Sequence, residues 1–174
     1  NEMTYVVERT CGICSFMHGM GYCESVEHIM DIEVPSRGRF LRTIWCEMSR
    51  LHSHLLWLGL LADGFGFESL FYECWRMREK ILDLFEMTTG GRCIFSVNKI
   101  GGVLKDIEDD MIKTILSVLN DMEKEINTIF WVPSALIVVA KLKAFRNVDI
   151  SKTLKRVLFC GEVMPNKQLN VWRK

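Results

Sequence analysis

The sequence lacks a net charge. Its 174 residues include 22 Lys and Arg and 22 Asp and Glu. Proteins that bind nucleic acids usually carry a basic excess or a basic stripe, so this balance argues against that class. It also gives no indication of electrostatic attachment to a membrane surface. Hydrophobic residues make up 49% of the chain and charged residues 25%, which predicts a packed core and excludes wholesale disorder.

The sequence also lacks an apolar run long enough for a transmembrane helix. The longest run, IFWVPSALIVVA at residues 129–140, is interrupted by Pro133 and Ser134 and is shorter than the ~18 residues that a spanning helix requires. No signal-peptide pattern is present. We therefore expect no direct membrane span. The chain starts at Asn1 rather than at methionine, which we interpret as the sign of a fragment or a processed product.

The cysteines do not make an even set. An odd count, with most members inside apolar helical patterns, predicts cytosolic thiols rather than a disulfide framework. One C-x-x-C pair is present and no second pair follows it. The seven cysteines are Cys11, Cys14, Cys23, Cys46, Cys74, Cys93 and Cys160.

Internal repeats and low-complexity linkers are absent, and the apolar spacing predicts a mainly α fold. We expect a long-helix bundle with a short β element, followed by a small α/β tail. The bundle occupies residues 1–126 and the tail residues 127–174. Apolar residues at three- and four-residue spacing predict the helices, and DGFG and TTGG mark their breaks. Within the bundle we expect a helical pattern over 12–30, a long helix from Ser36 that is broken by DGFG at 63–66, and a second that runs through Leu70 and Phe85 and stops near TTGG at 88–91. A further helix is expected over 104–126, and extended segments at TYVV and CIFSV.

The stretch VVERTCGICSFMHG, residues 6–19, carries the strongest chemical signal. Cys11 and Cys14 are spaced so that both sulfurs can reach one metal ion from a single turn. Thiolates select soft or borderline metals such as zinc, iron, nickel and copper(I). Arg9 would favour the thiolate form of either cysteine. The pair by itself is equally compatible with metal or redox use and with inert buried thiols.

A family resemblance favours the metal. The motif R-x-C-G-x-C-x-x-x-H, with Glu8 before it, resembles the N-terminal cysteine motif of nickel–iron hydrogenase large subunits. The resemblance extends over residues 1–126 through three further segments: SVEHIMDIEVPSRGRFLRTIWCEMSRLHSHLLWLG, RMREKILDLFEMTTGGR and NKIGGVLKDI. They are similar to the energy-converting branch of that family, which is related to the quinone-site subunit of respiratory complex I.

The resemblance implies roles for four residues. Cys11 would be a terminal nickel ligand and Cys14 would bridge nickel and iron. Glu8 and His18 would be hydrogen-bonding groups around the metal, with Glu8 a candidate proton relay. The family's site takes four thiolates, so this chain supplies half of the ligands of a nickel–iron centre. Implied partners are an iron–sulfur small subunit and membrane-arm subunits, at the cytoplasmic, inner face of the cell membrane.

The tail resembles a different family. Residues 127–174, with FWVPSAL and LFCGEVMP in order, are similar to an internal piece of an adenylate-forming enzyme of the D-alanine–carrier-protein ligase type. That resemblance places Gly161, Glu162 and Val163 near the adenine of ATP. The phosphate loop and the catalytic lysine of that family are absent, so we do not expect adenylation.

Four functions therefore remain open from the sequence. They are a partial catalytic subunit of an energy-converting hydrogenase, a metal-free quinone-facing subunit, a ligase fragment that binds ATP, and a non-functional chimera. We expect the chain to be incomplete as a stand-alone enzyme. Simpler interpretations apply to other residues. We expect His52 and His54 to be core or surface histidines, Trp45 and Trp57 to lie in the core, and Arg37, Arg39, Arg42 and Arg50 to form a solvated stripe or a basic face toward a partner subunit.

Overall fold

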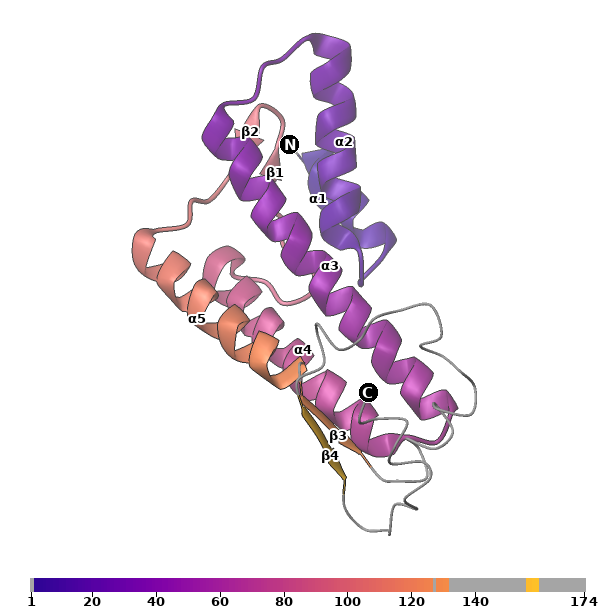
Figure 1. The fold of residues 1–174 in the computed structure, drawn as a ribbon. Helices are drawn as coiled ribbons and strands as arrows, with labels where there is room; N and C mark the ends of the chain where they lie inside the picture. The colour runs from indigo at the N-terminus through magenta and orange to yellow at the C-terminus, as the bar shows by residue number, and fades with distance from the viewer. Residues whose placement is uncertain (1, 127, 132–155, 160–174) are drawn as a thin grey trace, which may run out of the picture.

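The protein is mainly α-helical, as the sequence predicted. The computed structural model describes residues 2–126, 128–131 and 156–159 (Figure 1). None of the helices in this part of the chain is both long enough and apolar enough to cross a lipid bilayer. The described helices are α1 (Glu2–Val7), the 3₁₀ turn η1 (Glu8–Thr10), α2 (Ser15–Met30), α3 (Ser36–Gly64), α4 (Glu68–Thr89) and α5 (Asp109–Ile126).

The long helices α3 and α4 pack most extensively against each other (Figure 1). The break predicted at DGFG separates them: Gly66 has a φ of +79°, which glycine adopts without strain, and Phe67 N donates to Ala62 O at 2.8 Å. α4 ends where TTGG predicted, with Gly90 at a φ of +82°. α5 then packs on α4. The largest buried apolar side chains are Phe16, Trp45, Ile81, Phe85, Val97 and Ile107.

The first residues form a helix, so the strand predicted at TYVV is wrong. Thr4 of α1 is buried, and its hydroxyl lies 3.6 Å from the Cys23 sulfur of α2. Glu2 lies in the first turn, where the helix dipole favours a carboxylate. Among the described residues this run pairs with no strand, so helical hydrogen bonds and packing on α2 override its β propensity.

Two small sheets complete the described structure. β1 (Asn98–Lys99) and β2 (Gly102–Val103) are antiparallel, and β3 (Thr128–Trp131) is parallel to β4 (Arg156–Phe159), which agrees with the β part of the α/β tail predicted for residues 127–174. The strand predicted at CIFSV is wrong, because Ser96 has a φ of +51° and interrupts the extended backbone. The helical part of the predicted α/β tail lies outside the described residues.

The last helix of the bundle begins later than predicted, at Asp109 rather than Leu104. Two interactions hold the preceding residues in a non-helical connection. Arg37 pairs with Asp106 at 2.8 Å, and Ile107 N donates to Asp106 Oδ1 at 2.8 Å. The Asp106 side chain therefore replaces the helical hydrogen bond that Ile107 would otherwise make.

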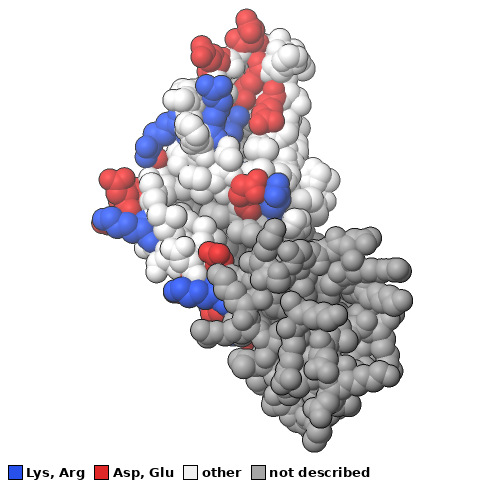
Figure 2. Space-filling view, in the orientation of Figure 1, with Lys and Arg blue, Asp and Glu red and all other residues white. Residues whose placement is uncertain are grey.

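Two further expectations need correction. Arg42 is not part of a solvated stripe: it is buried and binds the Glu27 carboxylate, with Nη2 2.6 Å from Oε1. Trp57 is 63% exposed, whereas Trp45 is fully buried as expected. Elsewhere on the face in Figure 2, basic and acidic side chains lie next to one another. Arg50, paired with Glu47 at 3.4 Å, follows the solvated pattern.

Candidate metal centre

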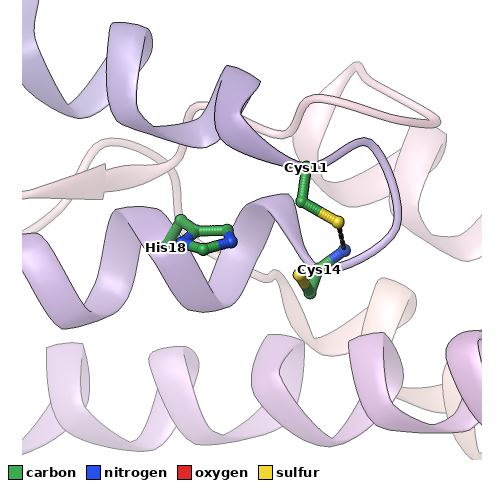
Figure 3. Close-up of side chains that lie close together, drawn as sticks. All are labelled: Cys11, Cys14 and His18. Atoms are coloured by element: carbon green, nitrogen blue, oxygen red, sulfur yellow. Dashed lines mark hydrogen bonds between the residues drawn. The ribbon is translucent and has the colours of Figure 1, made fainter.

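The two cysteines of the C-x-x-C pair lie in the loop between η1 and α2 (Figure 3). The backbone N–H of Cys14 points toward Cys11 Sγ, 3.4 Å away. The Cys14 carbonyl accepts the N–H groups of Met17 at 3.0 Å and His18 at 3.3 Å, and so begins α2. The helix therefore starts at Ser15, later than the predicted start at Gly12, and the cysteine loop stays free of helical geometry.

His18 joins the two cysteines in one cluster. It follows Cys14 by four residues on α2, which is the spacing that places two side chains on the same helix face. The ligand atoms of Cys11, Cys14 and His18 all lie within 4.8 Å of one another, and each side chain is partly exposed. Two sulfurs and one imidazole nitrogen are donors that nickel, iron and zinc accept.

The two thiols differ in acidity. The hydrogen bond from the Cys14 side chain lowers the pKa of Cys11, and the Cys14 and Ile13 backbone groups add to this effect. The same side-chain hydrogen bond, with burial second, raises the pKa of Cys14. Cys11 is therefore the first of the pair to become a thiolate, which is the form that binds metals.

Two distant segments hold the backbone of the cysteine loop. His52 Nε2 of α3 lies 2.9 Å from the Ile13 carbonyl. Burial, followed by the charge of Arg78, lowers the pKa of His52 to about 4, so the neutral ring carries its proton on Nε2 and donates it to that carbonyl. On the other side, Cys93 Sγ lies 3.2 Å from the Gly12 carbonyl. His52 is thus a core histidine, as expected, and it also fixes the loop.

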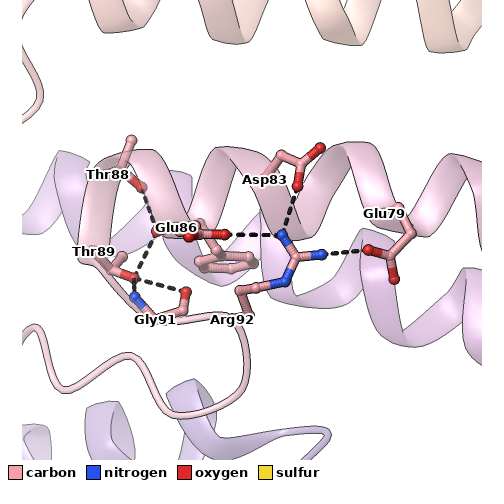
Figure 4. A network of polar contacts seen from close by, with 8 residues as sticks. Glu79, Asp83, Glu86, Thr88, Thr89, Gly91 and Arg92 are labelled. Carbon is pink, nitrogen blue, oxygen red and sulfur yellow. Dashed lines mark hydrogen bonds and ion pairs between the residues drawn. The ribbon is translucent and has the colours of Figure 1, made fainter.

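The segment that carries Cys93 is itself fixed to α4 (Figure 4). Arg92 binds Glu86 at 3.0 Å and Asp83 at 2.5 Å, and it also contacts Glu79. Gly91 turns so tightly that a methyl group there would lie 2.2 Å from the Ile94 carbonyl oxygen. This anchored turn brings the segment back over the start of α2, where Ser15 Oγ donates to the Cys93 carbonyl at 2.6 Å.

Glu8 is placed apart from the three-residue cluster, in the protein interior. Its side chain is fully buried, and Oε2 accepts hydrogen bonds from Ser96 N at 2.7 Å and Ser96 Oγ at 3.3 Å. Oε1 makes no hydrogen bond among the described residues, although the Asn98 amide is near enough to lower the carboxyl pKa. Burial outweighs these donors and raises the Glu8 pKa above its ordinary value.

The structure therefore brings three of the four predicted residues of the bundle together and puts the fourth in a separate buried site. The predicted nucleotide residues Gly161, Glu162 and Val163 lie outside the described residues. Sequence reasoning missed two residues that hold the site, Ser96 and Cys93. It also gave no role to Gly19, where a methyl group would lie 2.5 Å from Glu8 Oε1.

Two family models match this chain. The model for the respiratory-chain NADH dehydrogenase, 49 Kd subunit, matches residues 64–153, and the model for nickel-dependent hydrogenase matches residues 1–62. The first range runs past Ile126, the predicted domain boundary. That boundary and the adenylate-forming resemblance of the tail stay predictions.

Curated relatives of both kinds are similar to the chain. Formate hydrogenlyase subunit 5 of Escherichia coli is 46% identical over 115 residues, which cover 66% of this chain and 20% of the relative. The membrane-bound hydrogenase subunit alpha of Pyrococcus furiosus is 40% identical over 129 residues, covering 70% and 30%. An NADH-quinone oxidoreductase subunit of Thermodesulfovibrio yellowstonii is 40% identical over 117 residues, covering 67% and 29%. The chain thus spans less than a third of the length of these three relatives.

A solved structure shares the fold. A chain in the structure of the membrane-bound sulfane sulfur reductase, an archaeal respiratory membrane complex, has a TM-score of 0.68 and 26% sequence identity, covering 71% of this chain and 33% of that chain. Since the 49 Kd subunit model covers more than half of the residues and the hydrogenase model covers the cysteine loop, the chain belongs to the family of respiratory-chain NADH dehydrogenase 49 Kd subunits and their nickel-dependent hydrogenase relatives.

Proposed function

We propose that the chain is the metal-binding part of the catalytic large subunit of an energy-converting nickel–iron hydrogenase, in which electron transfer is coupled to hydrogen or proton chemistry. The observation that carries this proposal is the cluster of Cys11, Cys14 and His18, whose ligand atoms lie within 4.8 Å of one another. The relatives named formate hydrogenlyase subunit 5 and membrane-bound hydrogenase subunit alpha support the same assignment.

The two thiols have distinct tasks in this proposal. Cys11, the more acidic thiol, would be the terminal nickel ligand, and Cys14 would bridge nickel and iron. Together they supply half of the four thiolates that the family uses. Nickel and iron bound there supply the chemistry that splits or forms hydrogen. His18, one helical turn from Cys14, would hydrogen-bond a ligand sulfur and so tune its donor strength.

Glu8 would handle protons rather than metal. Its carboxyl group is buried next to the start of α2, and burial favours the protonated form. Hydrogen splitting releases protons, which need a titratable group on the way to solvent. Because burial favours the neutral, protonated carboxyl, Glu8 would release a proton only transiently. It would then take up another, so that no uncompensated buried charge persists.

The relatives indicate the setting of the proposed subunit. They are named as subunits or components of hydrogenases and NADH-quinone oxidoreductases, and one solved relative is part of a respiratory membrane complex. We propose that an iron–sulfur subunit exchanges electrons with the centre and that membrane-arm subunits hold the chain at the cytoplasmic face of the membrane. Exposed apolar side chains near the cysteine loop suit such a contact: Met3, Tyr5, Val6 and Ile13.

A quinone-facing subunit without metal is the alternative from within the same family. The match of residues 64–153 to the 49 Kd subunit accommodates it. The presence of both Cys11 and Cys14 in one loop, beside His18, favours the metal-binding assignment, because a metal-free role has no use for two converging thiols.

Metal titration of the full chain tests the proposal. Reduced protein is titrated with Ni²⁺ and with Co²⁺, and thiolate-to-metal charge-transfer absorbance is recorded. We expect saturable binding that Cys11→Ser or Cys14→Ser abolishes. Cys46→Ser is the matched control, since Cys46 is a partly buried free thiol of α3 outside the cluster. Equal absorbance in wild type and Cys11→Ser would overturn the metal assignment.

Activity of the assembled complex gives the second arm. The genomic neighbours are co-expressed with the chain, and hydrogen uptake and quinone reduction are measured for wild type and Cys14→Ser. The proposal predicts loss of hydrogen uptake in the variant. Quinone reduction that persists in Cys14→Ser, in a complex without hydrogen uptake, would favour the quinone-facing alternative.

A further inference from the structure

Ser96 has an unusual backbone conformation for its residue type. Its φ of +51° lies in the left-handed region, which side chains other than glycine, asparagine and aspartate seldom occupy. Ser96 lies between the anchored turn at Arg92 and the hairpin strand β1, so the chain could have continued as an extended strand there. Strained backbone of this kind persists where surrounding structure holds it, and it concentrates at functional sites.

The left-handed conformation directs two donors of one residue to one atom. Ser96 N lies 2.7 Å and Ser96 Oγ 3.3 Å from Glu8 Oε2. The other carboxyl oxygen, Oε1, faces the backbone of α2 at Gly19, where only the absence of a side chain leaves room for it. Oε1 is buried and has no hydrogen-bond partner among the described residues. The two oxygens of Glu8 therefore have opposite surroundings.

We propose that Ser96 is a positioning residue for Glu8, which reserves Oε2 as the acceptor of two hydrogen bonds and so makes Oε1 the atom that takes up and releases the proton. Protonation at Oε1 forms one O–H bond and leaves both Ser96 hydrogen bonds intact. Protonation at Oε2 would put a hydrogen between the carboxyl oxygen and its two donors. Release breaks the same O–H bond at Oε1, and no electron is transferred.

The other groups around Glu8 leave this control to Ser96. On α2, Cys23 is the titratable neighbour, and the Glu8 charge is a minor contributor to the rise of its pKa, after burial. On η1, Arg9 stacks on the Tyr5 ring at 3.5 Å instead of pairing with Glu8. On β1 and the segment that leads into it, the groups that face the carboxyl are Ser96, the Phe95 backbone and the neutral Asn98 amide.

This inference deepens the proposed role of Glu8 as a proton relay and rests on it for its biological purpose. The positioning itself is measured on the full chain without metal, partners or hydrogen. A failure of the relay is therefore distinguishable from a failure of the positioning.

The first experiment is a pH titration of Glu8 by carbon NMR in full-length chains with labelled glutamate, assigned with Glu8→Gln. Ser96→Ala and Ser96→Gly both remove the hydroxyl donor, which should lower the acid dissociation constant of Glu8 about three-fold or more. Ser96→Gly relieves the positive φ and should fold at least as stably as wild type, whereas Ser96→Ala keeps the strain. Ser25→Ala is the control, because the Ser25 hydroxyl bonds locally to the Gly21 carbonyl at 2.7 Å.

The proposal is supported if the acid dissociation constant of Glu8 shifts equally in the two Ser96 variants, although their stabilities differ. No shift in either variant, or a shift that follows lost stability, overturns it. Infrared spectra of protonated Glu8 add a signature that a purely structural role does not move. If Oε2 is the carbonyl oxygen that accepts the Ser96 bonds, its C=O stretch rises in frequency in both Ser96 variants. An unchanged stretch overturns the assignment of the proton to Oε1.

The final arm separates the two proposals. The enzymatic exchange of hydrogen gas with solvent deuterium is measured in the co-expressed complex with Glu8→Gln. Exchange that is lost supports the relay. Exchange that is retained, together with shifted Glu8 titration in the Ser96 variants, overturns the relay and supports the positioning.

Discussion

Two buried glutamates of this protein, Glu8 and Glu27, have opposite chemistry. Both contact the segment between α4 and α5: Glu8 accepts from Ser96 N, and Glu27 Oε1 accepts from Gly101 N at 2.7 Å. Glu27 also binds Arg42 through both oxygens, at 2.6 and 2.8 Å, and this partner lowers its pKa. Glu8 pairs with no cation among the described residues, and burial raises its pKa. The comparison teaches that the partner, more than burial, sets the charge of an interior carboxyl group.

The difference matches two tasks. The Glu27–Arg42 pair is fully bonded, since Arg42 Nη2 also donates to the carbonyls of Lys99 at 2.8 Å and Gly102 at 2.9 Å. It fixes the β1–β2 hairpin to α2 and α3 as a permanent charge pair. Glu8 keeps one oxygen without a hydrogen-bond partner in the part of the chain that the structure describes, and burial favours its protonated form, as the proposed proton relay requires.

The largest effect on stability should come from removing the cation that pairs with Glu27. Arg42→Met leaves the Glu27 carboxylate buried without its cation and removes the donors to two hairpin carbonyls. We expect a loss of about 3–5 kcal/mol in the free energy of unfolding, measured by urea denaturation of the full chain.

Two variants control for that change. Arg37→Met breaks the solvent-exposed pair with Asp106 and should cost far less. Glu27→Leu combined with Arg42→Met removes both buried charges and should recover part of the lost stability. If Arg42→Met were no more destabilising than Arg37→Met, the interior pair would not be what holds the hairpin.

A smaller effect should come from crowding Glu8. Gly19→Ala places a methyl group 2.5 Å from Glu8 Oε1, within a helix whose backbone cannot move away easily. We expect a loss of about 1–3 kcal/mol from overpacking, measured by urea denaturation.

Gly21 offers a matched control two residues further along the same helix. A methyl group there meets nothing within 4 Å, so Gly21→Ala should stabilise the helix by about 0.5–1 kcal/mol. Glu8→Ala in the Gly19→Ala background should relieve the clash. An equal cost for Gly19→Ala with and without the Glu8 side chain would show that the crowding lies elsewhere.

The smallest effect is a pair of opposite pH slopes. The Glu8 pKa is raised from 4.5, so its contribution to stability is present below that pH and is lost as pH rises through the folded pKa. The Glu27 pKa is lowered from 4.5, so its contribution is present above that pH and is lost as pH falls through the folded pKa. Compared with Glu8→Gln, wild type should therefore lose stability as pH rises. Compared with Glu27→Gln, wild type should lose stability as pH falls.

Urea denaturation at a series of pH values, for wild type and both glutamine variants, checks these signs. Slopes of the same sign for Glu8 and Glu27 would contradict the contrast between the two sites.

Local patterns predicted much of the fold. The helical spacing of apolar residues, the break at DGFG and the glycines after Thr89 located α3 and α4 nearly to the residue. The errors lie where local propensity competed with packing. TYVV became α1 because it packs on α2, and CIFSV lost its strand because Ser96 turns toward Glu8.

In the candidate site, too, contacts set by local spacing were predictable and contacts from distant segments were not. Cys11, Cys14 and His18 were predictable because their convergence depends on one turn and one helix face, which sequence spacing determines. His52, Cys93 and Ser96 were not, because each acts on the loop or on Glu8 from about 40 or more positions away in sequence.

By itself, the sequence determined the helical architecture, the family and the proximity of Cys11, Cys14 and His18, since these depend on periodicity and short-range spacing. The tertiary structure alone decided which glutamate is paired and which keeps a free oxygen. Proton affinity depends on burial and on partners brought from distant segments, such as Arg42 for Glu27 and Ser96 for Glu8. No pattern in the chain records those contacts, because they exist only after the helices have packed.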